Sequence, residues 1–124
     1  MRVLVADDSG LIRRILTGML QQECGIKDVV HAPDGAKAEA FWKDEEFDLI
    51  LLDWNMPKQS GIETLRAIRS VDAQIPVIMV TSEKEKHRVV EAVKAGASDY
   101  IIKPFTPKTV GEKIRRVLIN KVSA

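Results

Sequence analysis

Five short apolar runs recur along the chain, and each is followed by an amphipathic stretch. The runs occupy residues 2–6, 27–31, 48–53, 76–81 and 99–103. They lack the alternation of polar and apolar positions that a strand with one solvent-exposed face would show. Continuous apolar runs of this length are typical of strands buried on both faces of a parallel sheet.

The stretches between the runs carry apolar residues at helical spacing, three to four positions apart. The second stretch has the weakest pattern, marked only by Ala36, Ala40 and Phe41. The other four stripes consist of Leu11, Ile12, Ile15, Leu16, Met19 and Leu20; Ile62, Leu65 and Ile68; Val89, Val90 and Val93; and Val110, Ile114, Val117 and Leu118. The alternation of strand and helix predicts an α/β chain of the (βα)5 type with right-handed crossovers.

Residues that favour helix ends lie where the stripes begin and end. Residues 60–63 (Ser-Gly-Ile-Glu) and 82–85 (Ser-Glu-Lys-Glu) both have the sequence of a capping box. Thr106 places a capping hydroxyl before Pro107, and proline is favoured at the first position of a helix. Gly96 tolerates the left-handed backbone that ends many helices. These positions predict the starts of three helices and the end of one.

Composition and charge narrow the class of protein. The chain has 124 residues, of which 45% are apolar and 30% charged, and this predicts a single globular domain over residues 1–124. The net charge of +1 provides no field that would draw the chain to nucleic acid or to an anionic membrane. Cys24 is the only cysteine, so no disulfide framework forms, and no apolar run approaches the length of a membrane span. We therefore expect a cytoplasmic protein that binds neither nucleic acid nor membrane.

Polar side chains lie at the ends of four apolar runs. Asp7 and Asp8 follow the first run, Asp53 ends the third, Thr81 ends the fourth and Lys103 ends the fifth. The carboxyl ends of parallel strands share one edge of the sheet, where open α/β folds bind their ligands. Each residue alone has an ordinary role as a helix cap, a strand residue or a surface lysine. Their joint occurrence at strand ends indicates a functional site.

The residue types at this edge favour phosphoryl chemistry. Carboxylates crowded together repel, so one is protonated or a divalent cation lies among them. Mg²⁺ prefers carboxylate, water and phosphate oxygens, which makes Asp7 and Asp8 its predicted ligands. Asp53, also touching the metal, is the candidate nucleophile that forms an acyl phosphate. Lys103 and the cation would neutralise the phosphoryl oxygens.

The segments around these residues resemble the response-regulator receiver domain over essentially the whole chain. The motifs are Asp7-Asp8, residues 51–57 (LLDWNMP), residues 80–83 (VTSE) and residues 95–105 (AGASDYIIKPF). Within the family, residues 53–57 and 103–106 are similar to the standalone chemotaxis regulators. The resemblance implies a flavodoxin-like, doubly wound sheet of five parallel strands in the order 2-1-3-4-5. The apolar pattern by itself does not give that order.

The resemblance also implies roles for the residues at the sheet edge. Asp53 would accept a phosphoryl group from a histidine kinase, and Thr81 and Lys103 would contact the phosphoryl oxygens. The Lys103–Pro104 bond would be cis. The implied Mg²⁺ ligands are Asp7, Asp8, Asp53 and the backbone carbonyl of Asn55. Such a protein is not an enzyme, although it catalyses its own phosphorylation and dephosphorylation at Asp53.

A switch and an output face follow from the same resemblance. Tyr100 would turn inward when Thr81 moves toward the phosphoryl group. Asn55 and Glu83, two residues beyond Asp53 and Thr81, would tune dephosphorylation and give a short-lived phosphorylated state. The fourth helix, fifth strand and fifth helix would form a basic, partly apolar face suited to an amphipathic partner segment. The predicted members of this output face are Lys84, Lys86, Val89, Val93, Tyr100, Phe105 and Lys113.

The predicted function is that of a phosphorylation-gated response regulator in a two-component system. Its expected partners are a histidine kinase, a flagellar switch protein and a phosphatase. Two alternatives within the class are a phosphorelay carrier and a receiver excised from a larger regulator.

Two further alternatives come from other classes. A Mg²⁺-dependent aspartyl phosphatase acting on small molecules needs a second aspartate two residues after the nucleophile as general acid, and position 55 is asparagine. A flavodoxin would set the FMN phosphate against Asp7 and Asp8, which would repel it.

Overall fold

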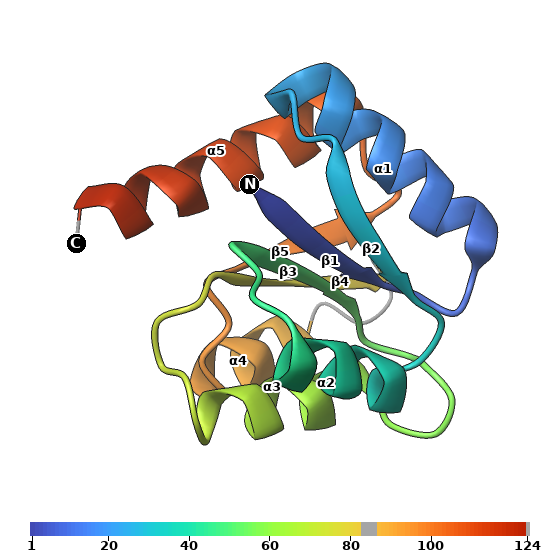
Figure 1. The fold of residues 1–124 in the computed structure, drawn as a ribbon, viewed down its shortest axis with the longest axis vertical. Coiled ribbons are helices and arrows are strands. Elements are labelled where there is room, and N and C mark those ends of the chain that lie inside the picture. Colours follow the sequence, from blue (N-terminus) through green and yellow to red (C-terminus); the bar gives the residue numbers. More distant parts are fainter. Residues whose placement is uncertain (83–86, 124) are drawn as a thin grey trace.

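Strands and helices alternate along the chain (Figure 1). The computed structural model describes residues 1–82 and 87–123. The strands are β1 (Arg2–Ala6), β2 (Asp28–Ala32), β3 (Leu49–Asp53), β4 (Val77–Ser82) and β5 (Asp99–Lys103). The helices are α1 (Gly10–Cys24), α2 (Gly35–Asp44), α3 (Gly61–Arg69), α4 (Arg88–Lys94) and α5 (Pro107–Ser123). The five predicted strands are confirmed, and no strand end differs from its predicted position by more than one residue.

The strands form one parallel sheet in the order β2-β1-β3-β4-β5. Helices α1 and α5 cover one face, and α2, α3 and α4 cover the other (Figure 1). This is the flavodoxin-like, doubly wound arrangement that the resemblance implied. The strand order reverses between β1 and β3, and open α/β sheets bind their ligands beyond the carboxyl ends of the strands at such a point. Among the described residues, no helix is both long and apolar enough to cross a bilayer.

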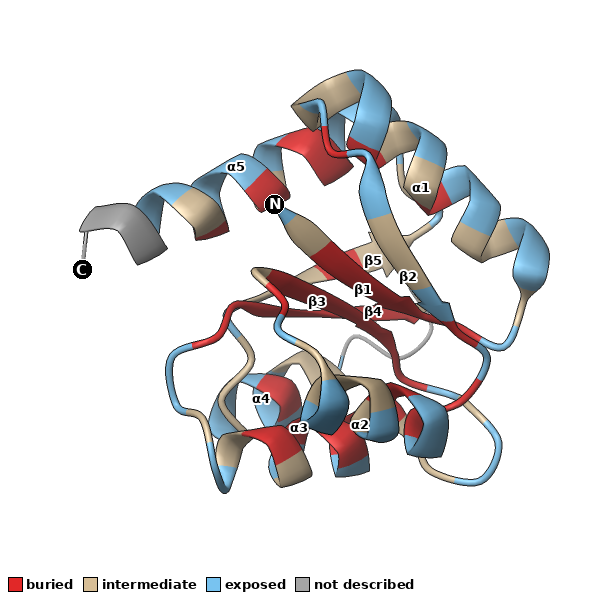
Figure 2. Ribbon diagram, in the orientation of Figure 1, coloured by how far each residue is buried: buried red, intermediate tan, exposed pale blue. Residues whose placement is uncertain are grey.

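The core explains why the central strands are apolar at every position. Successive side chains of a strand point to opposite faces, and helices cover both faces here. Leu4 of β1 lies in the cluster under α2 and α3, whereas Val3 and Val5 lie in the cluster under α1 and α5. Figure 2 shows the buried central strands between the two helical layers. The edge strands β2 and β5 are only partly buried.

Two of the predicted helical stripes face the core as expected. The buried residues are Ile62, Leu65 and Ile68 in α3, and Val110, Ile114 and Val117 in α5. In α1 the stripe is only half right, because Leu16 and Leu20 are buried but Leu11 and Ile15 are exposed. Helix α1 contacts the sheet along a narrower line than its run of apolar residues suggests.

The stripes predicted for α2 and α4 are wrong. In α4 the buried residue is Ala92, whereas Val90 and Val93 are 59% and 58% exposed. In α2 the fully buried positions are Gly35 and Ala38, not the exposed Ala36 and Ala40. In both helices the most buried positions are small residues, and in α2 a Cβ atom added to Gly35 would lie 2.1 Å from the backbone oxygen of Gln59.

Three of the four capping predictions are confirmed. Ser60 accepts from the Glu63 backbone N–H at 3.3 Å, and the Glu63 carboxylate accepts from the Ser60 backbone N–H at 3.3 Å. Thr106 accepts from the backbone N–H in the first turn of α5, and Gly96 has a φ of 100° just after α4. The capping box predicted at residues 82–85 lies largely outside the described residues, and Ser82 itself is the last residue of β4, paired with Lys103.

Gly61 provides a direct test of how α3 sits against the site. A Cβ atom added there would lie 2.1 Å from the backbone oxygen of Asp53, whereas one added at Gly18 in α1 meets nothing within 4 Å. We expect Gly61→Ala to destabilise the fold by about 1–3 kcal/mol through overpacking. Gly18→Ala, the matched control, should stabilise it by roughly 0.5–1 kcal/mol. Urea unfolding measures both, and equal effects of the two changes would contradict the close approach.

Candidate functional site

Three carboxylates meet at the carboxyl ends of β1 and β3. Asp53 is the last residue of β3, and Asp7 and Asp8 follow β1. One oxygen from each lies within 4.8 Å of the others. Asp7 and Asp53 are only 1% and 7% exposed, whereas Asp8 faces solvent. The structure thus brings together the three acids that the strand ends pointed to.

Lys103 lies between two of these acids. Its Nζ is 3.1 Å from Oδ1 of Asp53 and 3.3 Å from Oδ2 of Asp7. Lys103 ends β5, two strands away from Asp53, and its long side chain spans the end of β4. The Lys103–Pro104 peptide bond is cis, as expected from the resemblance. One ammonium therefore faces three carboxylates, so the cluster keeps an excess of negative charge.

The pKa values of the Asp53 carboxyl and the Lys103 ammonium are both raised. Burial, with a further contribution from the neighbouring Asp7 carboxylate, raises the pKa of Asp53 from 3.8 to about 6 despite the opposing charge of Lys103. Burial alone would lower the pKa of the Lys103 ammonium, but Asp53 and Asp7 outweigh it and raise that pKa. The site therefore favours the positive charge of Lys103 and disfavours the ionised form of Asp53.

Backbone contacts fix Asp7 in place. Its Oδ1 accepts a hydrogen bond from the backbone N–H of Ser9 at 2.9 Å. Its own backbone N–H donates to the carbonyl of Ala32 at 3.1 Å, and Arg13 donates to its backbone carbonyl. The Oδ2 atom thus points toward Lys103, and the turn before α1 determines that direction.

Thr81 lies one residue beyond Val80, the register partner of Asp53. Its Oγ1 is buried and has no hydrogen-bond partner among the described residues. Buried hydroxyls almost always have a hydrogen-bond partner, so an unpaired Thr81 hydroxyl beside a cluster of carboxylates is unusual. The position suits a hydroxyl that donates to a group bound at the end of β3.

The loop after β3 carries Trp54 and Asn55, and α4 contacts both. Nη1 of Arg88 donates to Oδ1 of Asn55 at 2.9 Å, and Cζ of Arg88 lies 5.0 Å from the centroid of the Trp54 ring. Sequence analysis assigned no role to Arg88. The available signal was a cation at the first position of a helix, where the helix dipole disfavours positive charge.

The structure describes part of the predicted output face. Tyr100 is half-buried on β5, with Nζ of Lys113 4.2 Å from its ring centroid. The same Nζ lies 3.0 Å from Oδ1 of Asp99, so the cation is held over the ring from α5. Val93 is exposed, and Val89 and Phe105 are half-buried. The predicted Glu83, Lys84 and Lys86 lie outside the described residues.

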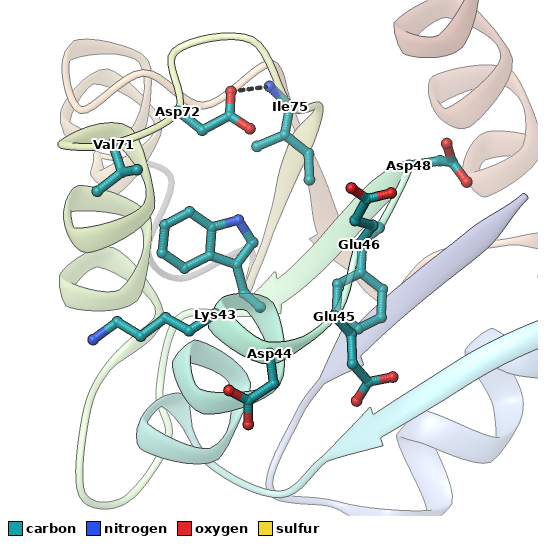
Figure 3. Close-up of a pocket in the computed structure, with 10 residues that line it drawn as sticks. Lys43, Asp44, Glu45, Glu46, Asp48, Val71, Asp72 and Ile75 are labelled. Carbon is teal, nitrogen blue, oxygen red and sulfur yellow. Dashed lines mark hydrogen bonds between the residues drawn. The ribbon is translucent and has the colours of Figure 1, made fainter.

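A second hollow lies at the opposite end of the strands and is lined by acidic residues (Figure 3). Two of these acids have partners within the fold. Glu45 forms an ion pair with Arg2 at 2.7 Å, and Asp72 accepts a hydrogen bond from the backbone N–H of Ile75 at 3.0 Å. Among the described residues, the one cluster of three metal-ligating side chains is that of Asp7, Asp8 and Asp53. Glu45 and Asp72 therefore have structural partners, and the candidate site is the carboxylate cluster.

Comparison with known proteins identifies the family. The model of the response regulator receiver domain matches residues 3–115. The chain belongs to this family. The receiver domain is 40% identical over 121 residues to a chemotaxis protein CheY homolog of Campylobacter jejuni, covering 95% of this chain and 92% of the relative. It is 37% identical over 119 residues to the chemotaxis protein CheY of Pseudomonas aeruginosa, covering 94% and 95%.

Solved structures agree with the sequence comparison. A CheY-like response regulator receiver domain protein from Methanospirillum hungatei matches with a TM-score of 0.89 at 30% identity, covering 98% of this chain and 96% of that one. The family resemblance seen in the motifs is thereby confirmed. Receiver domains are signalling modules of response regulators, which removes the aspartyl phosphatase and flavodoxin alternatives.

The raised pKa of Asp53 has a consequence for stability. Because its folded-state pKa of about 6 lies above the ordinary 3.8, the folded state holds the proton more tightly than the unfolded state. The contribution of Asp53 to stability is therefore fully present below about pH 4 and is lost as the pH rises through about 6. Without divalent cations, Asp53→Asn should therefore be more stable than the wild type at pH 7, by about 1–3 kcal/mol.

The same comparison at pH 4 is the internal control for this prediction. There the wild-type carboxyl is protonated, and the stability difference between the two proteins should shrink toward zero. Urea unfolding in EDTA measures it at both pH values. A difference that is the same at pH 4 and pH 7 would show that the charge of Asp53 is not responsible.

Proposed function

We propose that this receiver domain is a phosphorylation-gated switch of a two-component system, with Asp53 as the residue that accepts the phosphoryl group. The observation that carries the proposal is the buried Asp53 carboxylate, held 3.1 Å from Lys103 among two further acids. Such a carboxylate is a nucleophile beside a fixed positive charge. This is the arrangement that phosphoryl transfer requires.

The residues of the site fit a Mg²⁺ ion. Three carboxylates supply hard oxygen ligands, and the Lys103 ammonium that contacts Asp7 and Asp53 carries only one positive charge. The ligands would be Asp7, Asp8, Asp53 and the backbone carbonyl of Asn55. When bound, the ion supplies positive charge that favours the ionised carboxylate and the transferred phosphoryl group.

The transfer itself follows from the groups present. An oxygen of ionised Asp53 bonds to the phosphorus of a phosphohistidine in the partner kinase. The P–N bond breaks, and its electron pair returns to the imidazole, which takes up a proton. The Lys103 ammonium and the unpaired hydroxyl of Thr81 stabilise the phosphoryl oxygens. No general base is needed, because the attacking carboxylate is already ionised.

Phosphorylation would then act on Tyr100 and the output face. Thr81 would move toward the phosphoryl oxygens, and Tyr100 would turn inward and leave the Lys113 cation that now lies over its ring. A partner that binds the inward form stabilises it, and by reciprocity phosphorylation strengthens partner binding. Because the relatives are chemotaxis proteins, we propose a flagellar switch protein as that partner, and a single domain over residues 1–124 acting in the cytoplasm.

Asn55 and Glu83 are proposed to tune the lifetime of the phosphorylated state. Asn55 lies on the loop after β3, close to the reacting carboxylate, and Glu83 follows β4 in the sequence. A phosphatase would act on the same acyl phosphate. The protein in this account catalyses only its own phosphorylation and dephosphorylation.

Intact-protein mass spectrometry tests the proposal. With acetyl phosphate and Mg²⁺, the wild type should gain the mass of one phosphoryl group, and Asp53→Asn should gain none. Lys103→Met should slow the gain by roughly 100-fold or more, because a positioned charge is lost from the transition state. Omitting Mg²⁺ should also abolish it. Uptake by Asp53→Asn equal to that of the wild type would refute Asp53 as the acceptor.

The output face has its own test in partner binding. Val93→Glu places a charge on an exposed position of α4, so it should weaken binding of the flagellar switch protein to the beryllofluoride-activated domain by about tenfold. Val71→Glu is the matched control, since Val71 is also exposed but lies after α3. Titration calorimetry measures both. Equal affinities for the two variants would place the partner elsewhere.

A further inference from the structure

Gln59 links the loop after the phosphorylation site to two helices. Its half-buried side chain donates from Nε2 to Oε1 of Glu39 in α2 at 2.9 Å and to Oγ1 of Thr64 in α3 at 3.0 Å. Its backbone carbonyl accepts from the N–H of Gly35, the first residue of α2, at 3.2 Å. A Cβ atom added to Gly35 would lie 2.1 Å from that carbonyl oxygen, so α2 and the loop are in direct contact. One residue of the loop is thus tied to both neighbouring helices.

The same loop contains a strained turn. Lys58 has a φ of 67°, in the left-handed region that favours glycine, and the backbone N–H of Gln59 donates across it to the carbonyl of Pro57 at 2.7 Å. Three-residue turns with a positive φ at the central residue are rare and strained, and they persist only where neighbouring contacts enforce them. The Lys58 ammonium contributes little, because it lies 3.8 Å from Asp34 and its side chain is 73% exposed. The hydrogen bonds of Gln59, the next residue in the chain, are placed to enforce the turn.

The loop is short, so the position of Gln59 constrains that of Asn55. Backbone hydrogen bonds fix both ends of the loop: the N–H of Trp54 donates to the carbonyl of Val80 at 3.0 Å, and the N–H of Gly61 donates to the carbonyl of Trp54 at 2.9 Å. The Asn55 carbonyl between these ends is one of the proposed Mg²⁺ ligands, and Mg²⁺ demands near-ideal octahedral geometry. A small displacement of this carbonyl therefore weakens binding of the ion.

Packing does not require an amide at position 59. An apolar side chain of similar length would fill the same half-buried space, whereas glutamine uses both Nε2 hydrogens on acceptors in the two helices. Hydrogen bonds from Lys43 and from Gln59 lower the pKa of Glu39, so the acceptor in α2 is an ionised carboxylate and its bond with Gln59 is charge-assisted. A satisfied polar network of this kind makes the loop more rigid than apolar contact alone would.

We propose that Gln59 is a positioning residue that raises the affinity of the site for Mg²⁺ by holding the loop in the conformation that presents the Asn55 carbonyl. This inference rests on the proposed function. Gln59 acts through the backbone of the loop and not by contact with the ion. Without its hydrogen bonds the strained turn relaxes, and part of the binding free energy of Mg²⁺ then goes into reordering the loop.

The test is the Kd of Mg²⁺, measured at pH 7 from the backbone amide NMR shifts of Asp53 and its neighbours during a titration with magnesium chloride. Gln59→Met keeps an unbranched side chain of similar length but has no donor. It should raise the Kd about threefold to tenfold, the effect of one or two hydrogen bonds. Its fold should be little affected, because the Thr64 hydroxyl still donates to a backbone carbonyl at 2.9 Å and Glu39 still pairs with Lys43 at 2.8 Å.

Two changes at Glu39 separate hydrogen bonding from charge. Glu39→Met and Glu39→Gln remove the same negative charge, but only glutamine keeps a side-chain oxygen that accepts from Gln59. Glu39→Met should raise the Kd about twofold to fivefold, whereas Glu39→Gln should keep most of the wild-type affinity. Gln59→Met combined with Glu39→Met should bind Mg²⁺ no more weakly than Gln59→Met alone, because both act through one contact.

Ser98→Ala is the control for general loosening of the fold. It removes the acceptor of the Val77 backbone N–H, 3.0 Å away at the amino end of β4, and should leave the Kd of Mg²⁺ unchanged.

The outcomes distinguish the inference from the proposed function. A wild-type Kd in Gln59→Met, equal affinities for Glu39→Met and Glu39→Gln, or an equal loss in Ser98→Ala would overturn the role of Gln59 while leaving Asp53 phosphorylation intact. A wild-type protein that binds no Mg²⁺, or takes up no phosphoryl group on Asp53, would overturn the proposed function, and this inference with it.

Discussion

Repulsion among three carboxylates at one edge of the sheet is the constraint on which the rest of the site depends. Burial and the neighbouring Asp7 keep the pKa of Asp53 near 6, and the single Lys103 ammonium does not cancel the negative charge. A fold optimised only for stability would not bring these groups together, since each buried charge needs compensation. The surrounding structure holds them there: β1 and β3 are buried on both faces, and Gly61 lets α3 close directly on the Asp53 carbonyl. The proposed cation acts by relieving this repulsion.

The site also explains one feature that packing alone leaves unexplained. The Thr81 hydroxyl is buried without a partner among the described residues, although a hydrogen bond there would stabilise the fold. This hydroxyl is explained if the end of β3 receives an anionic group to which Thr81 donates. Features that reduce the stability of the fold are expected at functional sites, where the chemistry requires them.

Much of the fold and the cluster of site residues could be predicted from the sequence, and for one physical reason. Parallel strands covered on both faces must be apolar throughout, so the polar residues that end each run mark the same edge of the sheet. This rule located Asp7, Asp53 and Lys103 before the strand order was known. It did not extend to α2 and α4, where small residues make the close contacts and valines lie on the surface. The contact of Arg88 with Asn55 joins residues 33 positions apart, and no periodic pattern encodes it.

The central claim is that burial, with a further contribution from the neighbouring Asp7 carboxylate, raises the pKa of Asp53, and that a divalent cation bound among the acids lowers it again. The most direct measurement is a pH titration of the Asp53 side-chain carboxyl by ¹³C NMR, with and without Mg²⁺. The account predicts a pKa near 6 in EDTA and a fall of at least about one unit with saturating Mg²⁺. A pKa near the ordinary 3.8 that does not respond to Mg²⁺ would contradict it.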